Sequence, residues 1–207
     1  MSVSFSLPEG SLDRLCRADP ALGEVIRRVG PCALAPGGAE NALDALARSI
    51  VYQQLSGKAA ATIYGRFRTL FPAASFPAAS AVLAVEEERL RACGLSRQKL
   101  SYLRSLCEHV DQGMIALDAL GSLGDEEVIA ALTRIKGLGR WTAQMFLIFH
   151  LGRLDVWPVD DLGVRKGLAR VLGRAEPVTP AEARQHGERY RPYRSVAAWY
   201  LWRAAEG

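Results

Sequence analysis

The chain has 207 residues, of which 49% are hydrophobic and 23% are charged, and its formal net charge is +4. A chain of this length and composition buries a sizeable core, which excludes a disordered or low-complexity protein and predicts a soluble globular one. The modest positive charge is compatible with an anionic partner but does not require one.

The start of the chain and its cysteines give the next exclusions. The first ten residues, "MSVSFSLPEG", have neither the basic segment nor the apolar run of a secretion signal, and no apolar run in the sequence is long enough to span a bilayer. Cys16, Cys32, Cys93 and Cys107 form no C-x-x-C pair and are too scattered for a zinc or iron–sulfur site. We therefore expect a cytoplasmic protein with buried free thiols, no metal site and no cofactor.

Helical patterns begin near the N-terminus. Residues 11–30 predict two short helices that are broken at Asp19-Pro20. Residues 39–56 carry leucine, isoleucine and valine at helical spacing, and Ser56 is a predicted N-cap for a helix over residues 58–70. A Pro/Ala/Ser-rich connector follows over residues 71–80.

The rest of the chain continues in the same way, and almost no segment alternates polar and apolar residues with a period of two. The pattern predicts an all-α fold with about ten or more helices in one compact domain over residues 1–207. Ser96 is a predicted cap between two of the further helices, which are expected in segments 85–96, 97–113, 125–135, 140–152, 161–173, 180–190 and 193–206.

The most informative segment reads "LTRIKGLGRWTAQMF". Gly137 and Gly139 bracket Leu138, which lets the backbone turn sharply and approach another molecule closely. The next helix offers unpaired N–H groups at its start, and Lys136 and Arg140 add positive charge, so the segment suits a phosphate. An ordinary helical hairpin with a glycine cap is the alternative.

This segment resembles the helix–hairpin–helix of the base-excision DNA glycosylase superfamily. "KGLGRWTAQMF" followed by "VWPVDDLGVRKG" resembles in particular the 3-methyladenine DNA glycosylase II (AlkA-type) branch, and further similarity in "SIVYQQLSGKAA", "GLSRQKLSYL" and "RYRPYRSVAAWYLW" extends over roughly residues 40–204. The resemblance implies two helical lobes, approximately residues 1–35 with 115–207 partly mixed, and 36–114, with a DNA-binding cleft. The hairpin motif spans residues 126–151.

The resemblance also implies an activity. Such an enzyme flips an alkylated base, of the 3-methyladenine or 7-methylguanine type, out of double-stranded DNA and hydrolyses its bond to the sugar during base excision repair. Asp161 matches the catalytic aspartate, whose carboxylate stabilises the sugar cation. Bifunctional relatives carry a Schiff-base lysine where this chain has Trp141, so no lyase activity is expected. A monomer that works on the nucleoid is also expected.

Three side chains are predicted to bind the base. Trp141 and Met145 are four residues apart on one helical face, and Trp202 matches a pocket tryptophan of the AlkA-type family. Two indoles suit a cationic alkylated base, with a cation–π attraction of about 0.5–2 kcal/mol. The alternative is that both tryptophans are core residues.

The predicted contacts to DNA come from two segments. Leu55 matches the wedge that fills the gap left by a flipped nucleotide, with Gln54 beside it, although Leu55 could instead be a buried helix-end residue. The hairpin is expected to supply the remaining contacts, through Lys136, Gly137, Leu138, Gly139, Arg140 and Thr142.

Two adjacent carboxylates stand in "VWPVDDLGVRKG". Asp160 is the predicted N-cap of a helix that starts near Leu162. Asp161 is then expected at the first helical position, where the helix start favours its ionised form. The pair therefore predicts one structural and one catalytic aspartate.

Two other classes of function stay open on the sequence. A helix–hairpin–helix protein that grips DNA without excising a base would need neither Asp161 nor the two tryptophans. A bifunctional glycosylase/lyase is disfavoured by Trp141. A monovalent cation held by hairpin carbonyls is also left open.

Overall fold

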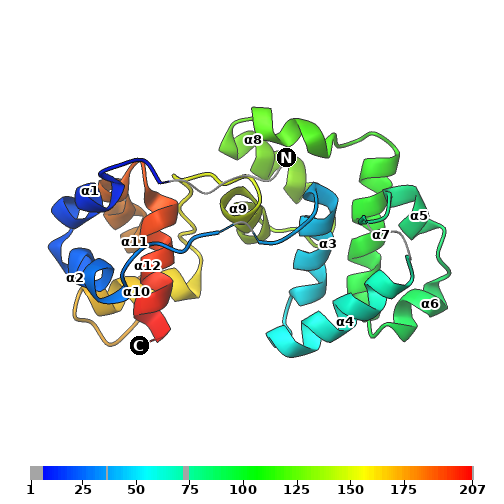
Figure 1. The fold of residues 1–207 in the computed structure, drawn as a ribbon, viewed down its shortest axis with the longest axis horizontal. Helices are drawn as coiled ribbons and strands as arrows, with labels where there is room; N and C mark the ends of the chain where they lie inside the picture. Colours follow the sequence, from blue (N-terminus) through cyan, green and yellow to red (C-terminus); the bar gives the residue numbers. More distant parts are fainter. Residues whose placement is uncertain (1–6, 36, 72–74, 207) are drawn as a thin grey trace. The chain divides into compact units, whose positions relative to one another are not determined.

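The computed structural model describes residues 7–35, 37–71 and 75–206, and every regular element within them is a helix (Figure 1). The predicted all-α fold is therefore confirmed. None of these helices is both long and apolar enough to cross a membrane. The elements are α1 (Ser11–Ala18), α2 (Pro20–Val29), α3 (Ala42–Tyr52), α4 (Gly57–Thr69), α5 (Ala79–Leu83), α6 (Glu87–Ala92), α7 (Arg97–Asp111), the 3₁₀-helix η1 (Leu117–Ser122), α8 (Asp125–Thr133), α9 (Arg140–Phe149), α10 (Leu162–Val171), α11 (Pro180–Gly187), the 3₁₀-helix η2 (Glu188–Tyr190) and α12 (Arg194–Glu206).

Local sequence signals set several helix starts. Asp19 is the N-cap of α2, and its side chain accepts hydrogen bonds from the backbone N–H groups of Ala21 and Leu22. The hydroxyl groups of Ser56 and Ser96 accept from the third residue of α4 and of α7. The predicted break at Asp19-Pro20 and both predicted caps are confirmed.

The chain divides into two units, which are Met1–Pro36 with Leu147–Gly207, and Gly37–Phe146. The second unit extends beyond the lobe expected over residues 36–114. Here η1 packs on α3, and the turn between α8 and α9 contacts the side chains of Gln53, which follows α3, and of Tyr102 on α7. Helix α9 runs from this unit into the other.

The first unit combines helices from the N-terminal and C-terminal parts of the chain. Helix α12 packs along α10 and also contacts α2 (Figure 1). The close approach of α10 to α12 depends on Gly167, because a Cβ there would collide with the backbone of Leu201. Leu22, Leu168 and Tyr200 are buried in this unit, so its core combines residues from both ends of the sequence.

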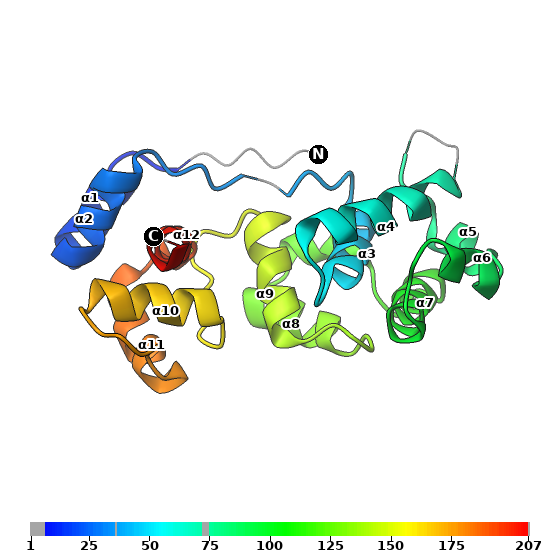
Figure 2. The same ribbon diagram turned by 90° about the horizontal axis from the view of Figure 1, so that it is seen from below.

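The second unit is built around α7. Helices α3, α5 and α6 each contact α7, and α4 packs on α3; α5 and α6 lie beside α7 in Figure 2. Leu46, Phe67, Leu103 and Leu132 are buried among these helices. This arrangement holds one face of α7 next to the hairpin that begins after α8.

Two features of the sequence prediction need comment. The connector expected over residues 71–80 includes residues 72–74, which lie outside the described residues, and it ends in α5, a five-residue helix that the sequence analysis did not predict. The four cysteines are free thiols, as expected, but only Cys93 and Cys107 are fully buried, while Cys16 and Cys32 are half-buried. Burial raises the pKa of the Cys107 thiol to about 12, which keeps it protonated and inert.

Candidate active site

The hairpin turn between α8 and α9 is held by two apolar side chains. Ile135 and Leu138 are 1% and 4% exposed, and their N–H groups bond back to the carbonyls of Leu132 and Ile135 at 3.1 Å. Lys136 and Gly139, which stand on either side of Leu138, are exposed. If Leu138 contacts DNA as predicted, it does so through its backbone and not through its buried side chain.

The two hairpin glycines have different structural reasons. Gly137 has φ of 91°, and a Cβ at this position would collide with the ring of Tyr102 on α7. Gly139 has no positive φ, and a Cβ there would meet nothing within 4 Å. Packing within the protein therefore explains Gly137 but not Gly139, and the open space above Gly139 lets another molecule approach the backbone.

The predicted wedge loop is connected to the hairpin. Gln53, the C-cap of α3, donates from Nε2 to the carbonyl of Gly137 at 3.0 Å. Gln54 has φ of 55° and is the one non-glycine residue of the described chain in the left-handed region. The side chain of Leu55 is 39% exposed, so it lies at a loop tip and not in the core. The buried alternative for Leu55 is wrong.

The start of α9 carries the predicted base contact. Trp141 is 48% exposed, which excludes the core alternative for this tryptophan, and Met145 is half-buried. Thr142 is 6% exposed, so its backbone is more accessible to a ligand than its hydroxyl. Both Trp141 and Met145 belong to the unit Gly37–Phe146.

Arg140 is not a simple cation beside the hairpin. Its guanidinium makes two hydrogen bonds to the carboxylate of Glu126 on α8, one of them 2.9 Å long between Nη1 and Oε2. The hydrogen bond from Arg140 lowers the pKa of Glu126. Because both groups are exposed, the pair adds little to stability, but it neutralises part of the charge that Arg140 would bring to a phosphate.

Asp161 is the N-cap of α10. Its Oδ1 accepts from the N–H of Val164 at 2.8 Å and from the indole Nε1–H of Trp202 on α12, also at 2.8 Å. The prediction that Asp160 is the cap is wrong. The N–H of Asp161 bonds to the carbonyl of Pro158, which makes a turn that carries Asp160 to the surface and leaves the cap position to Asp161.

Trp202 is half-buried, and two features fix its ring. It stacks on Phe149 with ring centroids 5.8 Å apart and planes at 21°. Its other contact is with α10 at Gly163, where a Cβ would lie 2.7 Å from the indole Cδ1. Phe149, Asp161 and Trp202 therefore form one cluster in the unit that holds both chain ends.

Within the described residues, no group of three or more His, Cys, Asp or Glu side chains could hold a metal ion. The carbonyl of Gly137 accepts a hydrogen bond from Gln53. The cluster of Phe149, Asp161 and Trp202 offers a held carboxylate beside stacked aromatic rings.

Comparison with known families decides the identity. Residues 47–192 match the family model described as the HhH-GPD superfamily base excision DNA repair protein, a range that includes the hairpin, Trp141 and Asp161. The chain belongs to this superfamily. The prediction made from the hairpin and the aspartate pair is confirmed at this level.

Several HhH-GPD proteins are similar over most of their length. DNA-3-methyladenine glycosylase 1 of Schizosaccharomyces pombe is 40% identical over 163 residues, which are 78% of this chain and 71% of that protein. The solved structure of 3-methyladenine DNA glycosylase of S. pombe in complex with abasic DNA superposes with a TM-score of 0.86 at 34% identity, covering 95% of this chain and 97% of that one. DNA-3-methyladenine glycosidase of Bacillus halodurans gives a TM-score of 0.85 at 37% identity, covering 98% and 91%. The expected resemblance to the 3-methyladenine DNA glycosylase branch is confirmed.

Sequence reasoning missed three residues of this HhH-GPD site, although each left a signal. Phe149 follows Met145 by four residues, so it continues the face of α9 that was predicted to bind the base. Gln53 stands next to the predicted contact Gln54, and Tyr102 lies in the segment "GLSRQKLSYL" that carries the family resemblance. Their roles depend on contacts with distant residues, which spacing alone does not give.

Proposed function

We propose that this HhH-GPD protein is a monofunctional DNA glycosylase that hydrolyses the bond between an alkylated base, of the 3-methyladenine or 7-methylguanine type, and its deoxyribose in double-stranded DNA. The observation that carries the proposal is the Asp161 carboxylate, which two N–H donors hold at the start of α10. The names of the relatives support the same substrate class.

The proposed chemistry needs little from the protein beyond a fixed negative charge. Alkylation of a ring nitrogen makes the base cationic, so it leaves as a neutral molecule. The sugar that remains resembles an oxocarbenium ion, and the carboxylate of Asp161 stabilises this cation. Water then adds to the sugar carbon and loses a proton, for which the same carboxylate is a suitable acceptor.

The aromatic residues support an alkylated base as the substrate. Phe149 and Trp202 lie beside Asp161, and Trp141 offers an exposed indole on α9. An aromatic face attracts a cationic base by about 0.5–2 kcal/mol more than a neutral one. We assign base contact to Trp141, Trp202 and Met145 on this ground.

The DNA contacts are assigned to the hairpin and to the loop after α3. The backbone at Gly139 is open to a phosphate, and Lys136 is exposed next to it. Leu55 is exposed at the loop tip after the left-handed Gln54, which suits a wedge that enters the base stack. We also propose that the protein acts as a monomer on DNA in the nucleoid.

Absence of lyase activity is also part of the proposal. A bifunctional enzyme forms a Schiff base between a lysine and the sugar. Trp141 occupies the position of that lysine in the superfamily pattern, and its indole cannot form one. We therefore expect the abasic product to keep an intact strand.

The test uses a duplex that contains 3-methyladenine or the slower-reacting 1,N6-ethenoadenine. The protein should release the free base, and the strand should break only after alkali. Asp161→Asn should lower the single-turnover rate about 100-fold or more, because asparagine keeps the helix cap but not the charge. The matched variant Asp160→Asn, at an exposed position, should stay within about threefold of the wild-type rate.

Three outcomes would count against parts of this proposal. Full activity of Asp161→Asn would remove the catalytic assignment. Trapping of a covalent DNA adduct by borohydride would show that the enzyme is a bifunctional glycosylase/lyase and not a monofunctional glycosylase. DNA binding without release of any base from a panel of alkylated duplexes would favour a binding module.

A further inference from the structure

One face of α7 forms a pocket that the hairpin partly closes. The pocket has a volume of about 410 Å³ and lies entirely within the unit Gly37–Phe146. Arg97, Ser101, Arg104 and Ser105 of α7 line it, with Ser101 three or four residues from each of the others, and Lys136, the residue before the first hairpin glycine, also lines it. The pocket therefore adjoins the segment that is proposed to bind DNA.

The charges in this pocket are not satisfied by ion pairs. Arg97 and Lys136 are exposed, and no ion pair joins either of them to another residue of the described chain. Glu87 and Glu108 also line the pocket and are likewise without an ion-pair partner in the same residues. Three cations therefore face two carboxylates, and the cations remain available to an anion from solution.

Arg104 adds a half-buried guanidinium to the same pocket. Its Nη2 donates to the carbonyl of Val85 at 3.0 Å, which fixes the side chain across the end of α5. Its Nε is buried and has no hydrogen-bond partner. The guanidinium is also without an ion-pair partner among the described residues, so its positive charge adds to the attraction of the pocket for an anion.

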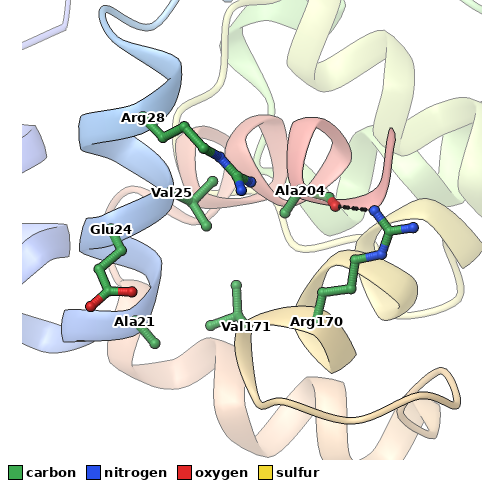
Figure 3. A pocket seen from close by; sticks show the side chains of 7 residues that line it. All are labelled: Ala21, Glu24, Val25, Arg28, Arg170, Val171 and Ala204. Atoms are coloured by element: carbon green, nitrogen blue, oxygen red, sulfur yellow. Dashed lines mark hydrogen bonds between the residues drawn. The ribbon is translucent and has the colours of Figure 1, made fainter. Parts of the chain in front are cut away.

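A second pocket lacks such a group of cations without ion-pair partners. It has a volume of about 370 Å³ and lies between α2, α10 and α12 (Figure 3). Val25 and Val171 form apolar walls, and Arg170 already donates to the carbonyl of Ala204 at 2.7 Å. That pocket has no cluster of uncommitted cations, so it supports no comparable inference.

We propose that the pocket lined by Arg97, Ser101 and Arg104 of α7 and by Lys136 of the hairpin binds a backbone phosphate of DNA, and so extends the contact of the hairpin. Two arginines and a lysine supply the charge, and the serine hydroxyl is a further donor to phosphate oxygens. Gly137 rests on Tyr102 of the same helix, so α7 and the hairpin keep a fixed spacing for two successive contacts. The inference rests on DNA binding by the hairpin and does not depend on base excision.

The test is the salt dependence of the dissociation constant for a short undamaged duplex. Arg97→Ala should weaken binding about three- to tenfold near 0.1 M salt and reduce the slope of log K against log [salt] by about 0.9, the value for one phosphate contact. Glu108→Gln should strengthen DNA binding, because it removes a carboxylate that repels the phosphate. Arg104 is left in place, since its bond to Val85 also supports the fold.

Arg89→Ala is the matched control. Arg89 is an exposed arginine on α6, and it stands two residues after Glu87, on a different face of the helix from the pocket. The control loses the same charge and should keep the wild-type slope. Equal slopes for Arg97→Ala and Arg89→Ala would overturn the proposal.

A free anion is the other source of the same chemistry. Inorganic phosphate, titrated at constant ionic strength, should compete with DNA only weakly, and the competition should be similar in the wild type and Arg89→Ala. Saturable phosphate binding that depends on Arg97, with an unchanged DNA slope in Arg97→Ala, would assign the pocket to a small anion and overturn the inference. Since the duplex is undamaged, failure of base release by the wild type would count against the proposed function alone.

Discussion

At the scale of single residues, the most specific feature is the bond between the Trp202 indole and Asp161. Trp202 was predicted to be a wall of the base pocket, and the structure gives its N–H a second task. The N–H fixes the Oδ1 of Asp161 at 2.8 Å, while the ring stacks on Phe149. Trp202 is therefore a positioning residue for the carboxylate in addition to its proposed contact with the base.

Trp202→Phe tests this positioning role. The variant keeps an aromatic ring but loses the N–H donor, and a hydrogen bond to a charged group contributes about 1.5 kcal/mol or more. We expect the single-turnover rate of base release to fall about tenfold or more, with little change in the affinity for undamaged DNA.

Phe149→Leu is the companion variant, because it removes the ring stack and leaves the N–H of Trp202 in place. Its rate should fall less than that of Trp202→Phe. The opposite order, with the larger loss in Phe149→Leu, would mean that stacking and not the hydrogen bond fixes Asp161.

At the scale of elements, the hairpin combines one glycine required by the fold with one that the fold does not require. Gly137→Ala would place a Cβ in the ring of Tyr102 at a φ of 91°. We expect this variant to lose about 1–3 kcal/mol of unfolding free energy in urea melts, because both strain and collision oppose it. Gly139→Ala should change stability by less than about 1 kcal/mol but weaken DNA binding, because its Cβ would stand where a phosphate approaches the backbone.

The two variants are informative as a pair. Wild-type DNA affinity in Gly139→Ala would show that no ligand approaches this part of the turn. Wild-type stability in Gly137→Ala would show instead that the hairpin can move off Tyr102, and that the contact with α7 is not rigid.

Elements whose ends are set by neighbouring residues were predictable from the sequence. Ser56 and Ser96 cap their helices through bonds to residues three positions later, and Asp19-Pro20 breaks the chain locally. The cap of α10 was assigned to Asp160 instead of Asp161 for a local reason as well, because the helix after the Pro158 turn starts at Leu162 and not at Asp161. Helix α5 was missed because five residues carry too little periodicity.

The tertiary part of the candidate site was less predictable. Family resemblance indicated Asp161, Trp141 and Trp202, but no spacing shows that Trp202 bonds to a residue 41 positions away. The support of the hairpin by Gln53 and Tyr102 likewise spans α3, α7 and the turn before α9. Such contacts depend on packing, which hydrophobic periodicity does not encode residue by residue.

At the scale of the whole molecule, one buried network joins the N-terminal helices to the C-terminal part of the chain. Asp19, which caps α2, also accepts from His186 Nε2 at 2.9 Å and from the Tyr190 hydroxyl at 2.7 Å. Burial alone would raise the pKa of Asp19, but the hydrogen bonds from His186, Tyr190 and the backbone of Leu22 outweigh it and lower the pKa to about 2. Because Asp19 is 5% exposed, water screens this network little.

The lowered pKa predicts how stability depends on acid. An aspartate whose pKa is lower in the folded protein than its ordinary 3.8 stabilises the fold above about pH 4, and that contribution is lost as the pH falls toward 2. A shift from 3.8 to about 2 corresponds to about 2 kcal/mol. Asp19→Asn should therefore lower the unfolding free energy by at least about 2 kcal/mol near neutral pH, and the gap to the wild type should narrow between pH 4 and pH 2.

Urea melts across this pH range measure the difference in unfolding free energy between Asp19→Asn and the wild type. The control is Glu24→Gln, which changes an exposed carboxylate on α2 and should follow the wild type at every pH. A gap that stays constant from pH 5 to pH 2 would show that Asp19 acts only as a neutral cap, and that its charge does not hold the two ends of the chain together.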